Sequence, residues 1–118
     1  MAITIYGIRN CDTMKKARHW LSEHGIDHAF HDYKASGIDR ASLENWVAEQ
    51  GWEVVLNRAG TTFRALPDGE KAGLDAERAI ALMLAQPSMI KRPVLDLGTR
   101  RVIGFKPDIY AAAFDGAA

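Results

Sequence analysis

The sequence predicts an α/β fold in which the two halves of a small sheet flank a helical middle. Three observations lead to it: a β-branched run that ends in glycine, a helical pattern directly after it, and two short apolar strands near the other end. The 118 residues include 47% hydrophobic and 25% charged side chains, a balance typical of a compact globular protein. We therefore expect one domain over residues 1–118, with the order βαβ, helices, ββα.

The first half has the pattern of strand, helix and strand. Residues 2–6 are rich in β-branched side chains and stop at Gly7, which indicates a strand. Helical spacing begins at Thr13 and is closed by His24 and a following glycine. Residues 28–33 are expected to form a second strand, which would complete a βαβ unit. The apolar face of the helix is predicted to consist of Met14, Ala17, Trp20 and Leu21.

Two longer helices are expected in the middle of the chain, over residues 40–50 and 76–86. An aspartate stands before each of them, Asp39 and Asp75, at the position of a helix N-cap. Between the two helices, residues 52–64 have no clear pattern.

The second half predicts a β-hairpin and a last helix. Residues 94–97 and 101–103 are apolar strands separated by a short turn that begins with glycine. Pro107 then stands in the first turn of a helix, where its missing N–H costs nothing. The apolar face of this helix is predicted to be Ile109, Tyr110, Ala113 and Phe114.

Charge and hydropathy argue against several functional classes. The 15 basic residues are balanced by 15 acidic ones, so no net field draws the chain to nucleic acid or an anionic membrane. No apolar run approaches the roughly 18 residues of a membrane span. The start of the chain has no basic leader, so we expect no signal peptide. A single cysteine favours a cytoplasmic location, and the balanced charge and small size favour a monomer.

Cys11 is the only cysteine, and it cannot form a disulfide within the chain. It lies where the first strand ends and the first helix begins. Free backbone N–H groups and the helix dipole favour a thiolate there, and Arg9 and Lys15 are near in sequence. Asp12 would oppose this effect if its carboxylate pointed at the sulfur. The alternative is a buried, inert cysteine that acts as a small apolar residue.

A proline and several cations are further candidates. Pro93 stands before an apolar strand, where it could be cis or simply a trans residue that opens the strand. Arginine binds oxyanions through a planar fork of donors, but a single arginine is usually a surface charge. The cations would matter if they converged near the cysteine; they are Arg58, Arg64, Arg92, Arg100, Arg101 and Lys106.

Three histidines, His24, His28 and His31, lie close together in the sequence. Strand alternation would put the last two on opposite faces. The chain has neither a CxxC nor an HExxH motif, so we expect no metal site.

Several segments together resemble the arsenate reductase (ArsC)-like family, which includes ArsC, Spx and YffB. The similarity runs through nearly the whole chain in the correct order. The run from Asn10 to Ala17, which contains Cys11, is most similar to the YffB branch. The other segments that carry the resemblance are Ile3–Gly7, Leu56–Arg58, Ile90–Val94, Gly98–Arg100 and Gly104–Pro107.

This resemblance implies a thioredoxin-like fold with a helical insertion between the βαβ and ββα halves. It also implies that Pro93 is cis and faces the active site. Cys11 would be the nucleophile, and Arg58 and Arg92 match two of three arginines that surround it in glutathione-coupled arsenate reductases. The third position holds Lys106 here, or is shared with Arg101 if the alignment slips. Lysine keeps the charge but loses the planar fork.

The residues and the resemblance together predict a glutathione-dependent monothiol oxidoreductase. Its thiolate would attack an oxidised sulfur, as in a mixed disulfide, or a small oxyanion. Glutathione, as co-substrate rather than bound cofactor, must then resolve the adduct, because the chain has no second thiol. Glutaredoxin is a further expected partner. The residues expected to bind the substrate or glutathione are Asn10, Asp12, Thr13, Arg92 and Pro93. The backbone N–H groups of Asp12 and Thr13 would stabilise negative charge at the start of the helix. The Thr13 hydroxyl would cap the helix.

Two other functions stay open. One is arsenate reduction, against which the lysine at position 106 argues. The other is a non-catalytic regulatory or binding module like Spx. Spx-like proteins typically carry a CxxC redox switch, whose second cysteine would fall on Met14 here. That switch cannot operate in this chain.

Overall fold

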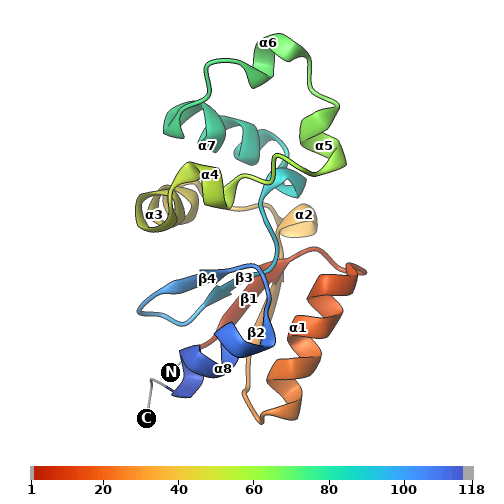
Figure 1. The fold of residues 1–118 in the computed structure, drawn as a ribbon, viewed down its shortest axis with the longest axis vertical. Coiled ribbons are helices and arrows are strands. Elements are labelled where there is room, and N and C mark those ends of the chain that lie inside the picture. Colours follow the sequence, from red (N-terminus) through yellow and green to blue (C-terminus); the bar gives the residue numbers. More distant parts are fainter. Residues whose placement is uncertain (1, 116–118) are drawn as a thin grey trace. The chain divides into compact units, whose positions relative to one another are not determined.

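The computed structural model describes residues 2–115, which form two compact units (Figure 1). One unit contains the described residues up to His31 and those from Arg92 onward; the other runs from Asp32 to Lys91. The prediction of one domain over residues 1–118 stays a prediction. The elements are β1 (Thr4–Gly7), α1 (Asp12–Glu23), β2 (Ala29–Asp32), α2 (Tyr33–Ser36), α3 (Arg40–Gln50), α4 (Trp52–Val55), α5 (Thr61–Arg64), α6 (Asp68–Lys71), α7 (Ala76–Ala85), η1 (Pro87–Met89), β3 (Val94–Asp96), β4 (Arg101–Ile103) and α8 (Pro107–Asp115).

The sheet has four strands in the order β2-β1-β3-β4. Strand β3 pairs antiparallel with both β1 and β4. On the other side of β1, the Ala29 N–H donates to the Ile3 carbonyl at 2.9 Å. The α/β fold predicted from the sequence, a βαβ half and a ββα half with helices between them, is confirmed.

The core of the first unit lies on one face of this sheet. The register places Ile5 opposite Leu95 and Leu95 opposite Val102, so these side chains form one apolar row. Helices α1 and α8 cover the same face (Figure 1). They contribute Met14, Ala17, Leu21, Tyr110 and Ala113 to the core. Within residues 2–115, no helix is long and apolar enough to cross a membrane.

Two sequence predictions in this region were wrong. Tyr33 does not end the second strand; it begins α2, because the Asp32 carboxylate accepts hydrogen bonds from the N–H groups of the next turn and caps a helix there. Ile109 is not part of the buried face of α8 and is 48% exposed. The helix turns Tyr110 and Ala113 inward instead, so its apolar stripe is narrower than the sequence indicated.

The second unit is built from short helices. Asp39 and Asp75 cap α3 and α7 through their carboxylates, as predicted. The segment without a clear pattern holds two one-turn helices, α4 and α5. Tyr33 is fully buried, and its hydroxyl donates to the Ile90 carbonyl at 2.8 Å. This bond links the start of the unit to its end, because Ile90 lies just before the chain returns to the sheet.

Candidate functional site

Cys11 is the residue directly before α1, and its carbonyl accepts the N–H of Lys15 at 3.0 Å. The chain reaches it from β1 through Asn10, which has a φ of 66°. Gly7, at the end of β1, makes room for the first turn of the helix. A Cβ there would overlap the sulfur of Met14. The glycine therefore lets Met14 pack over the strand end beside the cysteine.

The surroundings of Cys11 favour its thiolate. Partial burial raises the pKa of the thiol, but the backbone N–H of Met14, the Arg92 side chain and the backbone N–H of Thr13 together outweigh it, so that the pKa lies below its ordinary value. The Cys11 side chain forms no capping hydrogen bond with the helix. The N–H groups of the first turn instead act on the charge that the sulfur acquires when it ionises.

Arg92 reaches Cys11 because of the sheet topology. Cys11 follows the end of β1 and Arg92 precedes the start of β3, and the two strands pair antiparallel with Tyr6 opposite Val94. The loops at Cys11 and Arg92 therefore meet at one end of the sheet. The Arg92–Pro93 peptide bond is cis, as the family resemblance implied. Pro93 is buried, and its carbonyl accepts the N–H of Gly104 at 2.8 Å.

The structure corrects one role at the helix start. The Thr13 hydroxyl does not cap α1: Cys11 occupies the N-cap position, and no side-chain capping bond is formed. Thr13 lies in the first turn, beyond the position from which a hydroxyl caps a helix. The backbone N–H groups of Met14 and Thr13 lower the pKa of Cys11. Asp12 is not among the groups that shift this pKa.

The other predicted cations are not among the groups that lower the pKa of Cys11. The Lys106 side chain is exposed and forms neither a hydrogen bond nor an ion pair with the described residues. Arg101 is held by Asp96 across the β3–β4 hairpin, with an N–O distance of 3.6 Å. Arg58 belongs to the second unit, where its guanidinium lies 5.3 Å from the centre of the Trp52 ring. Of the predicted cations that share a unit with Cys11, Arg92 is the one that lowers the pKa of its thiol.

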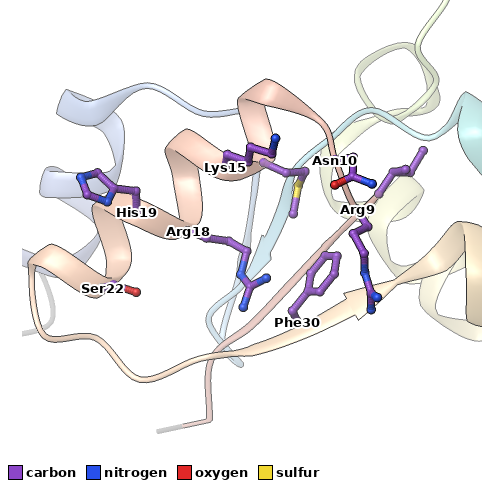
Figure 2. A pocket seen from close by; sticks show the side chains of 9 residues that line it. Arg9, Asn10, Lys15, Arg18, His19, Ser22 and Phe30 are labelled. Carbon is purple, nitrogen blue, oxygen red and sulfur yellow. The ribbon is translucent and has the colours of Figure 1, made fainter.

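A pocket beside this region was not predicted. It measures about 380 Å³ and lies along α1, between the loop that leads to Cys11 and strand β2 (Figure 2). Met14 and Asn10 line it, together with Arg18 and Phe30. The recurrence of Lys15, Arg18 and His19 at helical spacing was a signal in the sequence that could have indicated it.

The three histidines have local partners. The ring of His24 stacks on Trp20, His28 contacts the Ile26 carbonyl through Nδ1 at 3.1 Å, and the ring of His31 lies 5.0 Å from that of Tyr6. In the part of the chain that the structure describes, His, Cys, Asp and Glu side chains form no group of three that could hold a metal ion.

The fold and this site together define a class of protein. The fold is thioredoxin-like with a helical insertion, and it places a cysteine at the start of α1 and a cis proline before β3. The model of the ArsC family matches residues 6–113, and the chain belongs to that family. The family predicted from the sequence is therefore confirmed.

Three relatives illustrate the range of the family. The solved structure of the YffB protein is 66% identical, has a TM-score of 0.93, and is matched over 95% of this chain and 98% of its own. An arsenate reductase (ArsC) related protein from Brucella melitensis is 57% identical, with a TM-score of 0.77 and coverage of 97% and 95%. The global transcriptional regulator Spx of Streptococcus pyogenes is 29% identical over 90% of this chain and 80% of its own length.

Proposed function

We propose that this protein is a glutathione-dependent monothiol oxidoreductase that reduces mixed disulfides through Cys11. The observation that supports this proposal best is the lowered pKa of Cys11, which has its causes in Arg92 and in the first turn of α1. A thiolate is the nucleophile in thiol–disulfide exchange, and a lower pKa increases its fraction at neutral pH. With a single cysteine, the chain needs an external thiol to complete the reaction.

The reaction consists of two exchanges. In the first, the Cys11 thiolate attacks the glutathione sulfur of a mixed disulfide, and the disulfide bond breaks. The substrate leaves as a thiolate and takes a proton from water, while glutathione stays bound to Cys11 as a disulfide. In the second, the thiolate of another glutathione attacks that disulfide, releasing oxidised glutathione and the Cys11 thiolate. Together, the two exchanges convert one mixed disulfide and one reduced glutathione into the free thiol of the substrate and one molecule of oxidised glutathione.

The remaining residues have supporting roles in this proposal. Arg92 keeps the sulfur ionised and would hold an anionic group of the substrate. Arg58 and Lys106 would hold the substrate anion or a glutathione carboxylate. Asn10 in the loop, Asp12 and Thr13 at the start of α1, and Pro93 would bind glutathione beside Cys11. The chemistry requires a supply of reduced glutathione, so we place the protein in the cytoplasm and propose glutaredoxin as a second thiol donor.

The test begins with the pH dependence of Cys11 alkylation in the native protein. The proposal expects a pKa well below about 8.5 and, after treatment with oxidised glutathione, a single adduct that excess thiol removes. Reduction of a glutathionylated peptide should then require both glutathione and Cys11, and Cys11→Ser should abolish it. An ordinary or raised pKa with no adduct would overturn the proposal.

Arsenate reduction is a second candidate, because a relative 57% identical is described as arsenate reductase related. Lys106 argues for a low rate, since an ammonium cannot clamp an oxyanion as a guanidinium does. Turnover of arsenate with glutathione and glutaredoxin would favour this activity. Lys106→Arg should then raise the rate of arsenate reduction. If neither the wild type nor Lys106→Arg turns over arsenate, disulfide reduction remains the proposed activity.

The similarity to Spx raises a non-catalytic alternative. The second switch position is Met14, which is buried in the core of the first unit and has no thiol. A Cys11→Ser variant that kept the full biological activity of the protein would favour a binding module over the enzyme.

A further inference from the structure

The pocket along α1 combines positive charge with an apolar floor. Arg9, Lys15, Arg18 and His19 are among its lining residues, and none of the nine lining residues is acidic. Ile8 and Phe30, both half-buried, supply apolar surface from the loop after β1 and from β2. A volume of about 380 Å³ is within the range of pockets that hold small ligands.

The lysine and the arginine that α1 contributes to the pocket have no carboxylate partner among the described residues. Within residues 2–115, neither Lys15 nor Arg18 forms an ion pair. His19 is paired with Glu23, which lies outside the pocket. Positive charge without a counter-charge is left to attract an anion from solution.

Arg18 is held in place without being neutralised. Its guanidinium carbon lies 4.7 Å from the centre of the Phe30 ring, and its Nε donates to Nε2 of His28 at 3.5 Å. In the view of Figure 2, the Phe30 ring lies between the guanidinium groups of Arg9 and Arg18. The Arg18 guanidinium therefore places hydrogen-bond donors for an acid group over the Phe30 ring, next to apolar surface.

We propose that this pocket is a binding site for a small organic anion, in which a carboxylate or phosphate meets Lys15 and Arg18 while an apolar part rests on Phe30 and Ile8. Cys11 does not line the pocket, so binding requires no chemistry at the sulfur. The site thus goes beyond the proposed disulfide reduction and does not depend on it.

The proposal is tested by NMR titration of the reduced full-length chain at constant ionic strength. The probes are 1-naphthyl phosphate, 1-naphthoate, inorganic phosphate and the neutral 1-naphthol. At least one naphthyl anion should bind saturably and shift the amides around Lys15, Arg18 and Phe30. Inorganic phosphate and 1-naphthol should each bind more weakly, and the tighter naphthyl anion identifies the preferred acid group.

A matched pair of variants on the same helix separates the pocket from general charge. Lys15→Glu should weaken the binding of the naphthyl anion by roughly tenfold. Lys16→Glu makes the same change in charge at an exposed residue outside the pocket and should have little effect. Arg18→Gln provides a second, neutral variant and should also weaken binding. Equal losses at Lys15 and Lys16, or equal binding of 1-naphthol and the anions, would overturn the proposal.

Discussion

The side chain of Arg92 interacts with the sulfur of Cys11 and lowers the pKa of its thiol, although the two residues lie near opposite ends of the chain. The contact depends on the antiparallel pairing of β1 with β3, which brings the end of one strand and the start of the other to the same edge of the sheet. Its charge and its hydrogen bond both lower the pKa of Cys11. Reactivity at position 11 is therefore linked to a residue that no local sequence pattern connects with it.

Replacing Arg92 should make Cys11 less reactive. Arg92→Ala removes a hydrogen bond and a positive charge, so the pKa of Cys11 should rise and its alkylation at pH about 7 should slow several-fold. The alkylation rate of Arg92→Lys should lie between those of the wild type and Arg92→Ala, because lysine keeps the charge without the planar fork. Arg100→Ala, at an exposed arginine on the turn between β3 and β4, is the matched control. An unchanged alkylation profile in Arg92→Ala would contradict the assigned contact.

The thiolate should also make stability depend on pH. Because the folded chain lowers the pKa of Cys11, the stabilisation is fully present above the unfolded value of about 8.5 and is lost as pH falls through the lower folded value. We expect the free energy of unfolding of the wild type, relative to Cys11→Ala, to increase from acidic pH to pH about 9. Urea unfolding under reducing conditions measures this difference. A difference that stays constant over this range would show that folding does not favour the thiolate.

Asn10 tests the loop that leads into the site. Its φ of 66° is in the left-handed region, which asparagine tolerates and alanine disfavours. Asn10→Ala should lower the free energy of unfolding by about 1 kcal/mol, whereas Asn10→Gly should keep it or raise it. Thermal and urea unfolding of the pair provide the measurement. Equal effects of the two substitutions would mean that backbone conformation is not what selects asparagine here.

The sequence was informative wherever structure depends on near neighbours. The caps at Asp39 and Asp75 and the hairpin after Pro93 could be predicted, because capping and turn signals act within a few residues. Tyr33 was misplaced because its β-like side chain competes with a cap at Asp32, and the cap is the stronger local signal. These cases show that short helices inside a β-like pattern are decided by one hydrogen-bonding side chain.

The parts of the site that depend on distant residues could not be predicted in the same way. The position of Cys11 before a helix was evident, but its contact with Arg92 required the strand order, which only the family resemblance suggested. The exposure of Ile109 depends on how α8 is rotated about its axis against the sheet. The spacing of apolar residues in α8 does not determine that rotation. The pocket at Phe30 arises from two elements, α1 and β2, whose separation no spacing encodes.

Tyr110 and Tyr33 form a matched test of what a buried hydroxyl contributes. Both side chains are fully buried, but the Tyr110 hydroxyl has no hydrogen-bond partner among the described residues, whereas that of Tyr33 donates to the Ile90 carbonyl at 2.8 Å. Tyr110→Phe keeps the edge-on ring contacts with Trp20 and Phe105 and removes only an unsatisfied polar group.

The free energy of unfolding of Tyr110→Phe should therefore be unchanged or higher by up to about 1 kcal/mol, while Tyr33→Phe should lose about 1–2 kcal/mol because it leaves a buried carbonyl unpaired. Urea unfolding at neutral pH compares the two. Burial raises the pKa of Tyr110, so the unfolded chain ionises first as pH rises above about 10 and the wild type loses stability there. Tyr110→Phe should lose less stability than the wild type over the same alkaline range. A larger loss at Tyr110 than at Tyr33 at neutral pH would mean that the Tyr110 hydroxyl has a partner in solution.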